Sequence, residues 1–173
     1  VASLYLEQIQ GGRFFRHEHP ENATSWQEPA MEELKKIPGV IVARADQCQY
    51  GAEVQHGQEQ GQPVKKPTGF LTNSQKVAEA LSRRCTGGTT PCACSRDKGG
   101  RHVLCSGRVG RDAAVYPRGL CRAVMKGITN QLRSERRLKE GCFGVQLEDD
   151  EEEIRTAWQG PEQGFSGRYR DDL

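Results

Sequence analysis

The sequence has no long apolar run. None of its stretches approaches the roughly 18 consecutive apolar residues that a membrane-spanning helix requires. Nor does a charged segment lead into an apolar one, as it does in a secretory signal. We therefore expect a soluble intracellular protein, nuclear or cytoplasmic, with no membrane partner.

Apolar and aromatic side chains are also scarce. Of the 173 residues, 35% are hydrophobic and 6% are aromatic. A chain with so little to bury cannot form a large core. Its formal net charge is only +2, so the low apolar content does not indicate uniform disorder. A chain of this length is expected to form one modest domain diluted by polar segments.

The first 45 residues alternate between helical and strand patterns. Apolar residues at helical spacing predict helices over 1–10 and 29–37, and residues 13–18 and 40–45 are typical of strands. A capping box begins at Ser25, just before the second helix. The order helix, strand, helix, strand favours a parallel α/β sheet.

The next segments predict a hairpin and two further helices. Residues 52–63 are rich in Gln and Gly and indicate a hairpin tip, after which residues 65–72 return as a strand antiparallel to the preceding one. Asn73 or Ser74 can then cap a short helix. Residues 85–111 have the pattern of a loop, and Pro117 opens a helix with apolar residues four positions apart.

The C-terminal part has no folded pattern after Phe143. Six consecutive acidic residues occupy positions 148–153, and a Gly-, Gln- and Arg-rich stretch follows. The expected organisation is an α/β domain over residues 1–132, with a Cys- and His-rich basic loop at 85–111. Residues 133–173 are expected to form a basic, then acidic linker that is mostly disordered.

The cysteines favour free thiols or a metal site over a disulfide framework, because they number seven on a chain without a secretion signal. Five candidate ligands crowd one loop: Cys85, Cys92, Cys94, His102 and Cys105. Zinc would hold together a Gly-rich loop that has no core of its own. Against a metal, the loop has no Cys-x2-Cys pair, and alternating side chains diverge in an extended backbone. Zinc and free thiols are therefore both open interpretations.

Basic residues flank the same loop. Such a density of positive charge can neutralise the phosphates of DNA, or it can simply keep an exposed loop in solution. No aromatic residue is interleaved among the basic ones, which argues against a platform for stacking single-stranded bases. The basic residues are Arg83, Arg84, Arg96, Lys98, Arg101, Arg108 and Arg111.

Three blocks of sequence carry a family resemblance. They are residues 14–20 (FFRHEHP) followed by Ser25 and Trp26, residues 46–51 (DQCQYG) followed by 65–73 (KKPTGFLTN), and residues 115–121 (VYPRGLC). Together they resemble the C-terminal half of the DNA cytosine-5 methyltransferase-like proteins of phages and copia-type mobile-element polyproteins. The resemblance covers about residues 1 to 130. It implies a partial Rossmann-like methyltransferase sheet with an antiparallel hairpin.

The resemblance also implies catalytic positions. Glu18 falls where the family presents a carboxylate to the target cytosine, and a protonated carboxyl that donates to N3 of the ring eases attack at C6. Lys65 and Lys66 fall on basic positions near the family's active centre. The family's topology further implies that residues 16–20 and 65–73 lie side by side, with Glu18 within reach of a lysine. The alternative for Glu18 is a carboxylate held by neighbouring donors at a strand end.

The chain departs from the family in ways that bear on activity. Neither a Gly-rich loop for S-adenosylmethionine nor a Pro-Cys nucleophile precedes Glu18, and Pro91-Cys92 lies downstream of it. We therefore expect a retrotransposon-derived fragment that binds no S-adenosylmethionine and is inactive alone. Because the chain begins at Val1 inside a predicted helix, other segments of a longer polyprotein are expected partners. The alternative function is a nucleic-acid-binding module built on the Cys/His-rich, zinc-bound basic loop.

Overall fold

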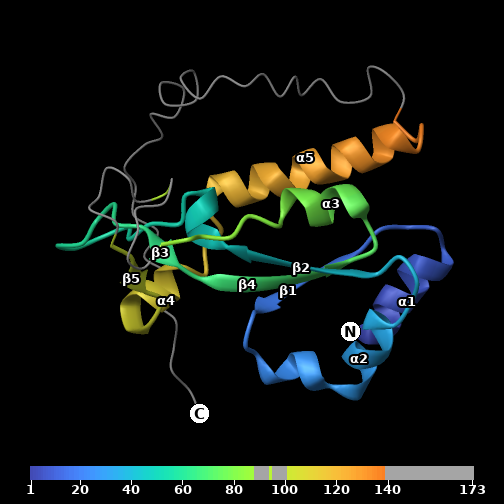
Figure 1. The fold of residues 1–173 in the computed structure, drawn as a ribbon, viewed down its shortest axis with the longest axis horizontal. Helices are drawn as coiled ribbons and strands as arrows, with labels where there is room; N and C mark the ends of the chain where they lie inside the picture. Colours follow the sequence, from blue (N-terminus) through green and yellow to red (C-terminus); the bar gives the residue numbers. More distant parts are fainter. Residues whose placement is uncertain (88–93, 95–100, 139–173) are drawn as a thin grey trace, which may run out of the picture. The chain divides into compact units, whose positions relative to one another are not determined.

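The computed structural model describes residues 1–87, Cys94 and residues 101–138, which belong to one folded unit, Val1–Leu138 (Figure 1). The expected linker lies almost entirely outside these residues. The secondary-structure elements follow in chain order: α1 (Ala2–Gln10), β1 (Arg16–Pro20), η1 (Thr24–Gln27), α2 (Pro29–Lys35), β2 (Ile41–Asp46), η2 (Gln47–Tyr50), β3 (Val64–Lys65), β4 (Pro67–Thr72), α3 (Gln75–Ala80), β5 (Val103–Leu104), α4 (Gly107–Asp112) and α5 (Arg118–Ser134).

The main sheet has three strands in the order β1-β4-β2, and both pairings are antiparallel. The expected parallel sheet is therefore wrong, although β1 and β2 do run in the same direction. β4 lies between them, so that Glu18 and Ala43 both face Phe70 of β4 in register. A parallel pairing occurs between the two-residue strands β3 and β5. The architecture is α/β, and the pairing does not reproduce the Rossmann-like sheet that the resemblance implied.

α3 and α5 cover one face of the sheet, where Phe70, Ala43 and Ala45 pack against Leu81 and Leu120 (Figure 1). α5 follows the predicted start, with Pro117 as its N-cap. The two helices approach closely because α5 has a glycine at the crossing: a Cβ on Gly127 would lie 2.8 Å from Val77 Cα. α3 begins as predicted, since the Ser74 side chain accepts a hydrogen bond from the backbone N–H of Val77.

α1 and α2 cover the opposite face of the sheet, where Leu71 of β4 packs against Leu34 and Trp26 (Figure 1). The Trp26 indole N–H donates to the Pro20 carbonyl at 2.8 Å, which fixes the ring against β4. Gly69 makes room for it, because a Cβ there would lie 2.8 Å from Trp26 Cζ2. Trp26 is thus a packing residue, as expected for a lone aromatic after a turn.

Several boundaries differ from the sequence prediction. The first strand begins at Arg16 rather than at residue 13, because Phe15 is buried against the α1 and α2 layer before the ladder starts. Ser25 lies inside η1, and Glu28 takes the N-cap position of α2. The segment 85–111 includes β5 and most of α4, where only a loop was predicted. Within the described residues, no helix has the length and apolar character needed to cross a bilayer.

Candidate metal centre

Three sulfurs and one imidazole converge at one end of the sheet. Cys48 lies on η2, Cys85 follows α3, Cys94 lies further along the same connection, and His102 directly precedes β5. One ligand atom from each lies within 4.8 Å of all the others. The chain separates Cys48 from Cys85 by a hairpin, β4 and α3, so that the fold, and not local spacing, creates the cluster.

The distances among Cys85, Cys94 and His102 match those of a tetrahedral site. The sulfurs of Cys85 and Cys94 are 3.8 Å apart, and His102 Nε2 lies 3.4 Å from Cys85 Sγ and 3.3 Å from Cys94 Sγ. A tetrahedral zinc ion with usual bond lengths separates two sulfurs by about 3.8 Å and a sulfur from a nitrogen by about 3.5 Å. A disulfide would require an S–S distance of about 2.05 Å. These three side chains are therefore spaced as ligands of one ion are, and the Cys48 sulfur lies within 4.8 Å of each of their ligand atoms.

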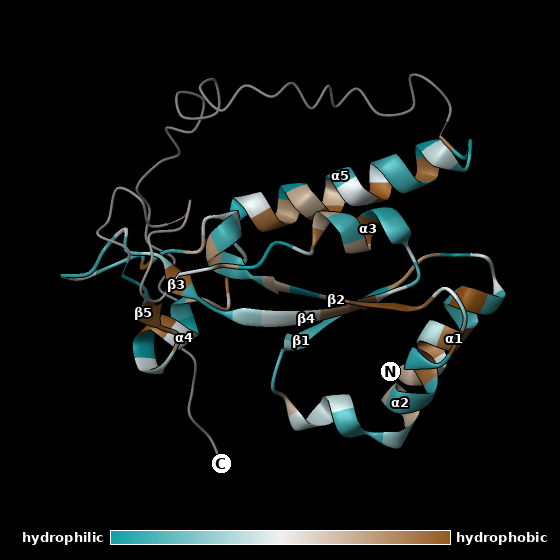
Figure 2. Cartoon of the chain, viewed as in Figure 1, coloured by the Kyte–Doolittle hydropathy of each residue, from teal (hydrophilic) through white to brown (hydrophobic). Residues whose placement is uncertain are grey.

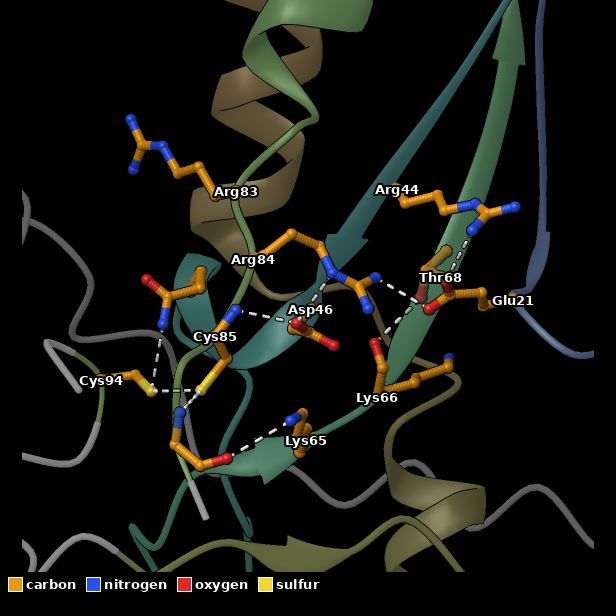
Figure 3. A network of polar contacts seen from close by, with 12 residues as sticks. Glu21, Arg44, Asp46, Lys65, Lys66, Thr68, Arg83, Arg84, Cys85 and Cys94 are labelled. Carbon is orange, nitrogen blue, oxygen red and sulfur yellow. Dashed lines mark hydrogen bonds and ion pairs between the residues drawn. The ribbon is translucent and has the colours of Figure 1, made fainter. Parts of the chain in front are cut away.

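Asp46 fixes the position of Cys85. Its carboxylate is buried at the end of β2, and Oδ2 accepts a hydrogen bond from the Cys85 backbone N–H at 2.8 Å (Figure 3). Arg84 Nε lies 3.5 Å from the same oxygen, and the Arg84 guanidinium also contacts Glu21 at 2.8 Å. A charged acceptor holds a backbone N–H more tightly than a neutral one. The loop that carries Cys85 is thus attached to the rigid sheet.

Tyr50 fixes the other side of this loop. Its hydroxyl donates to the Ala80 carbonyl at 2.9 Å and accepts from the backbone N–H of Arg83 at 3.2 Å. The ring lies in the core below α5, and the Arg83 guanidinium lies 5.5 Å from the ring centroid. Tyr50 belongs to the same η2 turn as Cys48, so one turn supplies a ligand and positions the loop that supplies the next.

Other contacts keep the cluster compact. Gln49 Nε2 donates to Cys94 Sγ at 3.4 Å, and the Gly87 backbone N–H donates to Cys85 Sγ at 3.2 Å. Lys65 Nζ donates to the Gly87 carbonyl at 3.3 Å (Figure 3). Gly87 has no room for a side chain, because a Cβ would collide with the His102 ring. N–H groups aimed at a sulfur stabilise its thiolate form, which is the form that binds metals.

Burial sets the chemistry of Cys48. Its side chain is 2% exposed, and this burial, followed by the neighbouring thiols of Cys94 and Cys85, raises the pKa of the Cys48 thiol. With its pKa raised, the Cys48 thiol stays protonated unless a positive charge lies beside it. A divalent cation would supply that charge and would deprotonate its thiol ligands on binding. The cluster could therefore hold a metal ion.

The predicted ligands are only partly brought together. Cys85, Cys94 and His102 lie in the cluster, whereas Cys105 does not, and Cys92 lies outside the described residues. Cys48 was missed as a ligand. The available signal was its place directly after a β-rich segment, since strand ends gather at sheet edges, but its distance along the chain from Cys85 concealed the connection.

The three residues that the family resemblance marks as catalytic, Glu18, Lys65 and Lys66, each contact a different partner. β1 does pair with β4, and the predicted juxtaposition of residues 16–20 with residues 65–73 is confirmed over residues 68–72. Glu18 accepts a hydrogen bond from the Tyr116 hydroxyl, while Lys65 and Lys66 donate to the backbone carbonyls of Gly87 and Ala113. Across the described part of the chain, no contact joins Glu18 to either lysine. The catalytic roles of these residues stay predictions.

Comparison with family models, with curated proteins and with solved structures finds no match to this chain.

Proposed function

We propose that this chain is a DNA-binding module whose fold is stabilised by one zinc ion bound to Cys48, Cys85, Cys94 and His102. The observation that carries the proposal is the cluster of four ligand atoms within 4.8 Å of one another, in which Cys85, Cys94 and His102 have the spacing of a tetrahedral site. Three thiolates and one imidazole form a soft ligand set, which favours zinc over magnesium or calcium.

A structural role for the ion follows from the ligand count. Four protein side chains complete a tetrahedral coordination shell and leave no open position for a water or a substrate, as a catalytic zinc would need. The surroundings also need a metal. Among the described residues, the small core cluster around Cys48 and Cys85 contains only cysteines. The ion would replace the missing core by joining η2, the loop after α3 and the segment before β5.

The charge distribution supports a polyanionic partner. Residues 1–138 contain 21 Lys and Arg against 13 Asp and Glu, a formal charge of +8, whereas residues 139–173 contain 4 against 10, a formal charge of −6. The net charge of +2 for the whole chain therefore conceals a basic folded unit. Arg101, which directly precedes His102, is exposed, and so are Arg108 and Arg111 on α4. Such a surface neutralises phosphates and draws DNA toward it.

Metal content and melting temperature test the zinc centre. The purified full chain should contain close to one equivalent of zinc, and chelation should lower its melting temperature because metal-binding free energy is folding free energy. Cys48→Ser should lose the ion. Cys121→Ser is the matched control, because Cys121 is exposed on α5, outside the cluster, and this variant should keep the ion.

DNA binding by the zinc-loaded and the chelated chain tests the rest of the proposal. A fluorescent duplex should bind the loaded protein with an affinity that falls as salt rises, and chelation should weaken this binding. A chain without zinc whose stability is indifferent to chelators would overturn the metal centre. Absence of DNA binding, together with binding of S-adenosylmethionine, would instead favour the methyltransferase-like interpretation.

A further inference from the structure

α5 has two chemically different faces. Its inner face packs on α3 and the sheet through Leu120, Val124, Gly127 and Ile128. In Figure 2 the hydrophobic positions of the helix lie toward α3. The outer face carries Arg118, Arg122, Lys126 and Arg133, all of which are exposed. We call these four residues the basic face of α5.

The basic residues of α5 lie on one side of the helix. At 100° per residue their directions fall within about 80° of one another, on the side away from Leu120 and Gly127. Three of them follow at intervals of four residues, or about 6 Å along the axis, and the set extends over about 22 Å. The helix has no Asp or Glu between Arg118 and Ser134. A basic stripe with no acidic interruption results.

The charges of the basic face have no side-chain partner among the residues that the structure describes. Lysines on or next to other helices have carboxylate partners three residues away, as in the pairs Lys36–Glu33 after α2 and Lys76–Glu79 on α3. Among the described residues, none of the four basic side chains of α5 forms an ion pair or a hydrogen bond with another side chain. Four unpaired cations side by side repel one another at a cost in stability, and an external polyanion would relieve that repulsion.

The shape and composition of the face select among polyanions. No Trp, Tyr or Phe occurs within α5, so the face offers no ring on which an unpaired base could stack. Arg and Lys side chains arranged along a rigid rod are suited to contact successive phosphates. The face therefore matches a regular duplex backbone better than a single strand.

We infer that the basic face of α5 binds the phosphate backbone of double-stranded DNA, without reading base sequence. This inference rests on the proposed DNA-binding function and names the surface that performs it. It assigns the main contact to α5 rather than to Arg101, Arg108 and Arg111. Zinc then acts at a distance, by holding together the unit on which α5 is mounted.

The salt dependence of binding measures how many phosphates the protein neutralises. The slope of log affinity against log salt changes by about 0.9 for each phosphate that is no longer neutralised. The double variant Arg122→Gln with Lys126→Gln should therefore flatten the slope by about 1.8. When salt rises from 50 to 200 mM, the factor by which affinity falls should be about 12 times smaller for the double variant than for the unmodified chain. The measurement is a fluorescence anisotropy titration of the zinc-loaded full chain with a duplex of mixed sequence.

A matched control removes the same charge from the other face of the sheet. Lys36→Gln with Arg44→Gln also deletes two exposed cations. Arg44 lies on the α2 side of the sheet, because it is paired in register with Gly69, and a Cβ on Gly69 would point toward Trp26. The control should leave the salt slope nearly unchanged. Unchanged melting temperatures would show that both double variants fold.

The outcomes separate the inference from the proposed function. If the chain binds duplex DNA but the α5 variant and the control behave alike, the inference is overturned, and Arg101, Arg108 and Arg111 become the next candidates for the contact. If the chain binds no nucleic acid, both fail. Tighter binding of single-stranded DNA or RNA than of the duplex also overturns the inference, because it requires base contacts that this face does not provide.

Discussion

Replacing Asp46 should weaken the metal centre without removing a ligand. Asp46 is fully buried, and its Oδ2 accepts the Cys85 backbone N–H at 2.8 Å while Arg84 Nε lies 3.5 Å away. Asp46→Asn keeps the shape of the side chain but loses the charge, and it places an amide N–H group in a buried position. A hydrogen bond to a charged group contributes about 1.5–3 kcal/mol, against about 0.5–1.5 kcal/mol for a neutral one. We expect a loss of about 1–2 kcal/mol in the free energy of unfolding.

Metal affinity should fall with stability in this variant. Groups that orient metal ligands through hydrogen bonds typically contribute 10-fold to 100-fold to affinity. We therefore expect zinc to bind Asp46→Asn at least about 10-fold more weakly in competition with a chromophoric chelator.

Glu21→Gln is the matched control for Asp46→Asn. Glu21 contacts the same Arg84 side chain at 2.8 Å but makes no hydrogen bond to a ligand residue in the described structure. This variant should lose no more than about 1 kcal/mol and should bind zinc normally. Wild-type zinc affinity in Asp46→Asn, or an equal loss in Glu21→Gln, would refute the argument that Asp46 positions Cys85.

Two further predictions concern the layer formed by α1 and α2. Gly69→Ala should reduce the free energy of unfolding by about 1–3 kcal/mol in urea titrations followed by tryptophan fluorescence, because the new methyl group would lie 2.8 Å from the Trp26 ring; unchanged stability would show that the ring can move. Burial, then the neighbouring His19, lowers the pKa of His17. As the pH falls, His17 is therefore protonated at a higher pH in the unfolded chain than in the folded one. Its contribution to stability is present above about pH 6.5 and is lost as the pH falls below it. The melting temperature of His17→Asn should fall less between pH 7 and pH 5 than that of the unmodified chain, and equal falls would contradict the assignment.

Local patterns in the sequence predicted most individual elements. Leu120, Val124 and Ile128 recur on one helical face after Pro117, and α5 begins where that pattern begins. Ser74 caps α3 because its short side chain reaches the third backbone N–H, a purely local interaction. Such elements depend on neighbours along the chain, and neighbours are visible in a sequence.

The sheet order and the fourth ligand depend on distant pairings. Alternation of helices and strands gives β1 and β2 a common direction, but it does not reveal that β4 pairs between them. Cys48 was missed for the same reason. Its side chain comes close to Cys85 only once β2, β4 and α3 are assembled. A search for ligands within one loop finds Cys85, Cys94 and His102 and cannot find Cys48.

The zinc K-edge X-ray absorption spectrum of the purified full chain tests the central claim most directly. If Cys48, Cys85, Cys94 and His102 bind one zinc ion, the spectrum should show three sulfurs at about 2.3 Å and one nitrogen at about 2.0–2.1 Å. Cys48→Ser should reduce the sulfur count to two in whatever zinc it retains. A protein without zinc, a shell dominated by oxygen or nitrogen, or a sulfur count that Cys48→Ser leaves unchanged would contradict the account.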